Sequence, residues 1–239
     1  MATFVVIHGA WSAGWAWKKM RPLLREQGHE LFTPTQTGLG ERSHLARPDI
    51  DLETHIADIL GVLRFEDLHD VFLVGHSYGG MVATGVADRA AERIAHLVYL
   101  DAFVPRDGQS LADLAGTAAH ARASAAARDH GEGWRVPGNP MPPDTDAEDL
   151  AWAAPLRMMQ PLMTFEQKLR LTGAVERLPR SYVYCTRSGP GDVFRQFISR
   201  ARSEPGWSYF ELDGSHNPHI TMPGTLARLL DGIANGEHS

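Results

Sequence analysis

Two kinds of segment alternate along this chain. Short, continuous apolar runs are typical of buried strands, and longer segments with apolar residues every three or four positions are typical of helices that pack one face on a core. The strand-like runs are Thr3–Ile7, His29–Pro34, Val71–Val74, Ala95–Leu100, Ser181–Thr186 and Trp207–Leu212. The helix-like segments are Ala16–Gln27, Leu52–Phe65, Met81–Ala91, Val193–Ala201 and Thr225–Ala234. This alternation predicts an α/β fold with a mostly parallel, doubly wound sheet.

The segment from Asp107 to Gly173 has a different character. It is rich in alanine and arginine at first, then crowded with proline and glycine over Pro137–Pro143, and it contains no clear strand. A stretch of this length is too long for a plain loop. We therefore predict a mostly helical cap over residues 107–173, inserted into an α/β core formed by residues 1–106 and 174–239.

Composition narrows the class of protein. The 239 residues carry a net charge of −6 without a basic block, so neither nucleic acid nor an anionic membrane is an expected partner. No apolar run has the length of a membrane span, and the first residues lack the pattern of a secretory signal. One cysteine, Cys185, excludes an internal disulfide. We expect a soluble, cytoplasmic protein; whether it forms a homodimer is left open.

The strongest motif lies where the run Val71–Val74 ends. Gly75-His76-Ser77-Tyr78-Gly79 has the form G-x-S-x-G, and a helix-like segment follows at once. Strand, sharp turn and helix form the context of a nucleophile elbow, which holds a serine hydroxyl above the edge of a sheet. A glycine-rich turn with a solvated serine is the competing interpretation.

Backbone N–H groups beside Ser77 are candidates for an oxyanion hole. The loop His8-Gly9-Ala10-Trp11 follows the first predicted strand, and Tyr78 follows the serine. Such loops can direct their N–H groups toward an oxyanion. We therefore assign the Ala10 and Tyr78 N–H groups to this role, with a simple strand-to-helix loop as the alternative.

A serine nucleophile needs a base and a group that orients the base. Among the twelve histidines, His216 is preferred because it follows the last predicted strand in a Gly-Ser-His turn, and His219 is its rival. The acid is open between Asp101, at the end of one strand, and Asp192, in the loop after another; Asp213 is too close to His216 to reach around it. His55 and His69 are expected to be surface or capping residues.

The quoted motifs resemble those of the α/β-hydrolase superfamily over nearly the whole chain. Within it, the chain is similar to plant methyl-ester esterases and hydroxynitrile lyases, and more so to small bacterial esterases and carbamate hydrolases. The resemblance rests on Phe4–Trp11, Thr33–Gly40, Gly75–Met81, Tyr99–Pro105 and Gly214–Pro223. It implies Ser77 as nucleophile, His216 as base, and Ala10 and Tyr78 as oxyanion donors.

Two departures from the plant enzymes matter. Those enzymes place their acid in the loop after a Cys-Thr pair, where this chain has Ser188 near the expected carboxylate. Because some relatives take the acid from the strand after the elbow helix, we favour Asp101, with Asp192 second. The related lyases have a lysine directly after the catalytic histidine and a threonine in the oxyanion loop; here Asn217 and Ala10 occupy these positions, which favours hydrolysis.

The expected function is that of a serine hydrolase for a small ester or carbamate with an aromatic or otherwise apolar part. The substrate class follows from the resemblance and from the tryptophan and methionine content. Expected pocket residues are Trp11, His76, Phe103 and Met159. No metal or organic cofactor is implied. The alternatives are a non-catalytic, ligand-binding homologue and a hydroxynitrile-type lyase.

Overall fold

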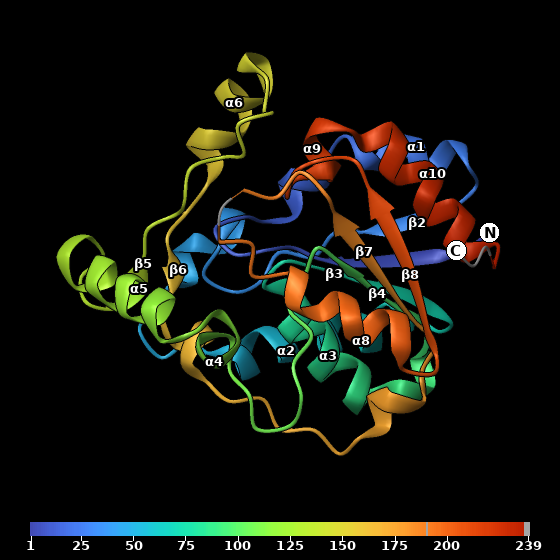
Figure 1. The fold of residues 1–239 in the computed structure, drawn as a ribbon, viewed down its shortest axis with the longest axis horizontal. Helices are drawn as coiled ribbons and strands as arrows, with labels where there is room; N and C mark the ends of the chain where they lie inside the picture. Colours follow the sequence, from blue (N-terminus) through green and yellow to red (C-terminus); the bar gives the residue numbers. More distant parts are fainter. Residues whose placement is uncertain (190, 237–239) are drawn as a thin grey trace.

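A six-stranded sheet forms the centre of the computed structural model, which describes residues 1–189 and 191–236 (Figure 1). The strand order is β2-β1-β3-β4-β7-β8, and every neighbouring pair is parallel. The strands are β1 (Thr3–Ile7), β2 (Glu30–Phe32), β3 (Val71–His76), β4 (Ile94–Leu100), β7 (Arg180–Cys185) and β8 (Trp207–Leu212). The predicted α/β fold with a parallel, doubly wound sheet is confirmed.

Helices cover both faces of this sheet (Figure 1). One face carries α2 (Leu52–Phe65), α3 (Gly79–Arg89) and α8 (Ile198–Ser203), and the other carries α1 (Met20–Glu26), α9 (Pro218–Thr221) and α10 (Pro223–Ala234). In β1, Val5 belongs to the first of two buried clusters and Val6 to the second. Because successive side chains of a strand point to opposite faces, a strand buried on both sides is a continuous apolar run, as Phe4–Ile7 of β1 is.

Two predicted helices begin later than their sequence pattern indicates. The predicted helix Ala16–Gln27 is a 3₁₀ turn, Gly14–Trp17, followed by α1. Pro22 lies in the first turn of α1, and the ring of a proline clashes with the carbonyl four residues before it, so the helix cannot extend backward. The predicted helix Val193–Ala201 likewise starts as a 3₁₀ turn, Arg195–Phe197, before α8. Further 3₁₀ turns are Gly40–Leu45, Ala91–Arg93, Ala154–Leu156 and Ala174–Arg177.

Residues 107–173 lie between β4 and β7 in the chain. They contain α4 (Leu111–Ala115), α5 (Thr117–His130), α6 (Ala147–Ala153) and α7 (Met163–Glu166). Helices α4, α5 and α6 stand beyond the carboxyl ends of the strands, and the end of the segment returns beside α3, where the Thr172 and Gly173 N–H groups donate to Asp88 (Figure 1). The prediction that this segment lacks strands is wrong, because β5 (Arg135–Val136) and β6 (Gln160–Pro161) form an antiparallel pair. Strands of two residues are too short to leave a pattern in the sequence. The division into core and cap stays a prediction.

Within the described residues, no helix has both the length and the apolar character that crossing a bilayer requires. The polar residues Asn235–Ser239 after the last apolar helical period predict a frayed end; residues 237–239 of this stretch lie outside the described part of the chain.

Candidate active site

The turn between β3 and α3 holds Ser77 in a constrained conformation. Ser77 has a φ of +56°, in the left-handed region that L-residues with a side chain rarely adopt. A Cβ on Gly79 would lie 2.2 Å from the Ile7 carbonyl oxygen, and one on Gly75 would lie 2.8 Å from the Gly79 carbonyl oxygen. Only glycine therefore fits where strand and helix pass each other, and the turn has the geometry of the predicted elbow.

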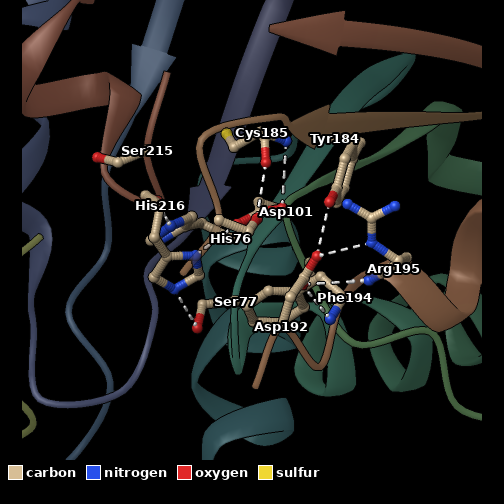
Figure 2. A network of polar contacts seen from close by, with 12 residues as sticks. His76, Ser77, Asp101, Tyr184, Cys185, Asp192, Phe194, Arg195, Ser215 and His216 are labelled. Atoms are coloured by element: carbon tan, nitrogen blue, oxygen red, sulfur yellow. Dashed lines mark hydrogen bonds and ion pairs between the residues drawn. The ribbon is translucent and has the colours of Figure 1, made fainter. Parts of the chain in front are cut away.

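His216 lies between Ser77 and Asp101 (Figure 2). Its Nε2 atom is 2.9 Å from Ser77 Oγ, and its Nδ1 atom is 2.7 Å from Asp101 Oδ2. The Asp101 side chain is 2% exposed and that of His216 is 33% exposed, so the carboxylate is enclosed while the imidazole faces accessible space. The structure thus brings together the three residues that the sequence singled out.

The chemistry of the three groups fixes the direction of these hydrogen bonds. An ionised carboxylate can only accept, so His216 Nδ1–H donates to Asp101. In the neutral ring Nε2 then lacks a proton and accepts the hydrogen of the Ser77 hydroxyl. A serine in this arrangement can lose its proton to the imidazole as its oxygen attacks an electrophile.

Asp101 is positioned by the end of β4 and by the neighbouring strand β7. Its φ is +42°, its N–H donates to the Val183 carbonyl at 2.7 Å, and its Oδ1 accepts from the Cys185 N–H at 3.2 Å. These contacts leave Oδ2 for His216.

The two other carboxylates that were weighed as the acid, Asp192 and Asp213, are bound by groups other than His216. Asp192 accepts from the Tyr184 hydroxyl at 2.6 Å and from the Phe194 N–H at 2.9 Å (Figure 2). Asp213 is exposed and forms an ion pair with Arg187.

Neighbouring rings hold His216 in place. Phe194 stacks on its imidazole with a centroid separation of 4.9 Å, and His76 Nε2–H donates to the His216 carbonyl at 2.7 Å. Burial lowers the pKa of His76 well below its usual value, so this residue is neutral at pH 7. His219, the rival base, is buried and stacks on Trp17 at 4.6 Å, and burial lowers its pKa to about 3.

The expectation that His55 is a surface or capping residue is wrong. Its side chain is completely buried and bridges two elements: Nε2–H donates to the Thr37 carbonyl at 3.0 Å, and Nδ1 lies 2.9 Å from the Tyr78 hydroxyl. Burial lowers the pKa of His55 to about 4. The bond ties Tyr78, the residue after Ser77, to α2. In the sequence, the burial of His55 could have been recognised from its position in the apolar period of α2, beside Ile56 and Ile59.

The two predicted oxyanion donors face the same cavity. Ala10 and Tyr78 both line it, beside Ser77 and His216. Within the described part of the chain, neither backbone N–H donates a hydrogen bond to another group. Tyr78 also immediately precedes α3, whose N-terminal end carries a partial positive charge. Both N–H groups can therefore bind an anionic oxygen.

The cavity has a volume of about 750 Å³ and is bounded by the sheet edge and by residues 107–173. Its apolar wall includes Leu111, Ala115, Ala119, Ala123, Val136, Met141, Phe165 and Phe194. The predicted pocket residues Trp11, His76 and Phe103 line it. Met159 does not: it is 37% exposed at the surface of the segment after α6. A methionine's place in a loop is not encoded by any local pattern.

Comparisons with known proteins agree with this fold. Residues 4–229 match a family described as the "Alpha/beta hydrolase family". A protein named carbendazim hydrolyzing esterase, from Nocardioides sp. (strain SG-4G), is 41% identical over 98% of this chain and 100% of its own length. A pFDCC methylesterase of Arabidopsis thaliana is 26% identical over 97% of this chain and 94% of its own. The structure of an extracellular alpha/beta-hydrolase from a Paenibacillus species superimposes with a TM-score of 0.83 at 27% identity, over 96% of this chain and 98% of that one.

Proposed function

This chain belongs to the alpha/beta hydrolase family and is an esterase-type hydrolase, and on this premise we propose that it cleaves a small ester or carbamate through an acyl-enzyme formed on Ser77. The observation that supports the proposal is the unbroken line of hydrogen bonds from Ser77 Oγ through His216 to Asp101. Ser77, at one end of this series of hydrogen bonds, lines a cavity that is large enough for a small aromatic molecule.

The proposed reaction begins with attack by Ser77. Its Oγ attacks the substrate carbonyl carbon while His216 Nε2 takes the hydroxyl proton, and the Asp101 carboxylate stabilises the imidazolium that results. His216 then returns the proton to the leaving group as the tetrahedral intermediate collapses. A water molecule, deprotonated by His216, attacks the acyl carbon. As the bond to Ser77 Oγ breaks, His216 returns the proton to Oγ, which releases the acid and restores the Ser77 hydroxyl.

The developing oxyanion would be held by the Ala10 and Tyr78 N–H groups. Hydrogen bonds to a localised negative charge are stronger than those to a neutral carbonyl oxygen, so these donors stabilise the transition state more than the bound substrate. The Tyr78 hydroxyl is hydrogen-bonded to His55 Nδ1, so the position of this donor residue is fixed before the substrate binds.

The cavity supports an aromatic or apolar substrate part. Rings of Trp11, Phe103, Phe165 and Phe194 contribute to its wall, and Phe103 packs edge-to-face on Phe194 with centroids 5.1 Å apart. The relative at 41% identity is named for the hydrolysis of carbendazim, which is consistent with a carbamate as well as an ester.

A lyase remains the weaker alternative. Residue 217, directly after His216, is an asparagine whose amide nitrogen lies 3.9 Å from Met141 Sδ. A neutral amide cannot hold a cyanide ion as the lysine of the related lyases would, so hydrolysis is the better match to this position.

A substrate panel tests the proposal. We expect the purified protein to hydrolyse p-nitrophenyl acetate, small aryl methyl esters or carbendazim, with turnover lost in Ser77→Ala, and to release no cyanide from mandelonitrile. Cyanide release dependent on His216 would instead identify a lyase. Tight binding of these compounds without any turnover would identify a ligand-binding homologue.

A further inference from the structure

Trp11, next to the proposed oxyanion donor Ala10, has a backbone conformation that residues with a side chain rarely adopt. Its φ is +60°, which is costly for a residue with a large side chain. The neighbouring Gly9 is tightly packed: a Cβ there would lie 2.9 Å from Ser77 Cβ. Such a loop keeps its shape only if contacts from other parts of the chain hold it.

The first half of the loop is held from inside the core. The His8 ring donates from Nδ1 to the Gly9 carbonyl at 2.9 Å and accepts the Gln36 N–H on Nε2 at 3.1 Å. Burial lowers the pKa of His8 to about 4, so the ring is neutral and can play both parts.

The second half of the loop is Trp11, and its hydrogen bonds within the described residues all come from the segment 107–173. Its N–H donates to Gln160 Oε1 at 3.2 Å, its carbonyl accepts the Met158 N–H at 3.2 Å, and its indole Nε1–H donates to the Val136 carbonyl at 2.9 Å. Val136 and Gln160 are paired across the β5–β6 ladder. This ladder of two short strands therefore presents the two acceptors that bind Trp11.

The amide of Gln160 can accept this bond in only one orientation. Gln160 is 0% exposed, and its Nε2–H donates to Thr164 Oγ1 at 2.9 Å. The Thr164 hydroxyl donates in turn to the Pro161 carbonyl at 2.6 Å, so its oxygen is the acceptor for Gln160. A flipped amide would set Nε2–H against the Trp11 N–H and leave both donors buried without an acceptor.

We propose that Gln160 is a positioning residue that fixes the oxyanion loop through the Trp11 N–H, so that the 107–173 segment controls how the transition state is stabilised. Gln160 does not line the cavity and would act only through Trp11. The inference rests on the proposed function where it concerns catalysis. The structural part of the inference, that the bond from Gln160 to the Trp11 N–H holds the loop (the Gln160 clamp), does not depend on that function.

The test compares Gln160→Met with Gln167→Met. Methionine is close to glutamine in length but gives the Trp11 N–H no oxygen acceptor. Gln167 is the matched control, because it also joins this segment to the core: its Oε1 accepts the Glu53 N–H at 2.8 Å and its Nε2–H donates to Asp51. That bond holds the start of α2 and does not touch the oxyanion loop.

For Gln160→Met we expect kcat for an aryl ester to fall by about 10- to 100-fold, because a displacement of about 1 Å at a reacting group has effects of this size. KM should change little. Inhibition by an aryl trifluoromethyl ketone, whose serine adduct carries an oxyanion, should weaken by the same factor as kcat. Gln167→Met should have a kcat, a KM and an inhibition by the ketone close to those of the wild type, while its melting temperature is comparable to that of Gln160→Met.

A second readout does not depend on activity. Hydrogen–deuterium exchange of the peptide containing Ala10 and Trp11 should be faster in Gln160→Met than in wild type or Gln167→Met. If the methionine variant does not fold, Gln160→Asn takes its place, since its amide is one methylene too short to reach Trp11. Unchanged exchange in the peptide, or equal losses of kcat in the two glutamine variants, would overturn the inference. Faster exchange in a protein whose wild type lacks esterase activity would keep the clamp and refute the proposed function instead.

Discussion

Replacing His216 by alanine should lower kcat for an aryl ester by an amount on the order of 10⁶-fold, as loss of the base does in other serine hydrolases. His216 is the described side chain whose ring nitrogen reaches Ser77 Oγ, at 2.9 Å. Without it the hydroxyl keeps its proton and remains a poor nucleophile. Steady-state kinetics at pH 8, with KM measured separately, checks this result.

His219→Gln is the control, because it removes the other histidine of the same loop. His219 is buried against Trp17, and its pKa of about 3 keeps it neutral, so its contribution is packing. This variant should lose stability in thermal unfolding but keep most of its turnover. A larger loss of kcat in His219→Gln than in His216→Ala would show that the base has been misassigned.

Asp101→Asn should lower kcat by about 10⁴-fold, the effect that this change has where a buried aspartate orients a catalytic histidine. The Cys185 N–H donates to Asp101 Oδ1, and in the variant it would retain the amide oxygen on that side. The amide nitrogen would then face His216 Nδ1. The His216 Nδ1 atom would then accept a hydrogen bond from the amide, so the ring proton would lie on Nε2. A protonated Nε2 cannot take the proton of the Ser77 hydroxyl.

Asp192→Asn is the matched control for the acid. Its carboxylate is bound to the Tyr184 hydroxyl and to the backbone of its own loop, and it makes an ion pair with Arg195 at 3.6 Å. We expect a modest loss of stability and a kcat close to wild type. If Asp192→Asn caused the large loss of kcat and Asp101→Asn did not, the assignment of the acid would be reversed.

The sequence predicts the parts of this structure that depend on local patterns. Continuous apolar runs locate the strands, because strands buried on both faces have no polar face to interrupt them. The G-x-S-x-G motif locates Ser77, because only glycine fits at its two ends: a Cβ at Gly75 would clash with α3, and one at Gly79 would clash with the end of β1. His216 follows from its position after the last strand.

Contacts between distant segments explain what the sequence did not reveal. From the residues alone, the acid is open between Asp101, at the end of a strand, and Asp192, in the loop after another, and it is the family resemblance that favours Asp101. Only the three-dimensional arrangement directs Asp101 toward His216 and Asp192 toward Tyr184. Gln160 left no local signal, because its partner Trp11 lies far along the chain. For His55, the apolar period of α2 indicated burial, but its bond to Tyr78 could not be read from the sequence.

Labelling with a fluorophosphonate, followed by mass spectrometry of the modified peptide, tests the central claim most directly. The reagent reacts only with a serine that a neighbouring base has activated. We predict that the folded wild-type protein takes up one label on Ser77, and that Ser77→Ala takes up none. A folded wild-type protein that remains unlabelled, or one labelled on a different serine, would contradict the claim that Ser77 is the nucleophile of this enzyme.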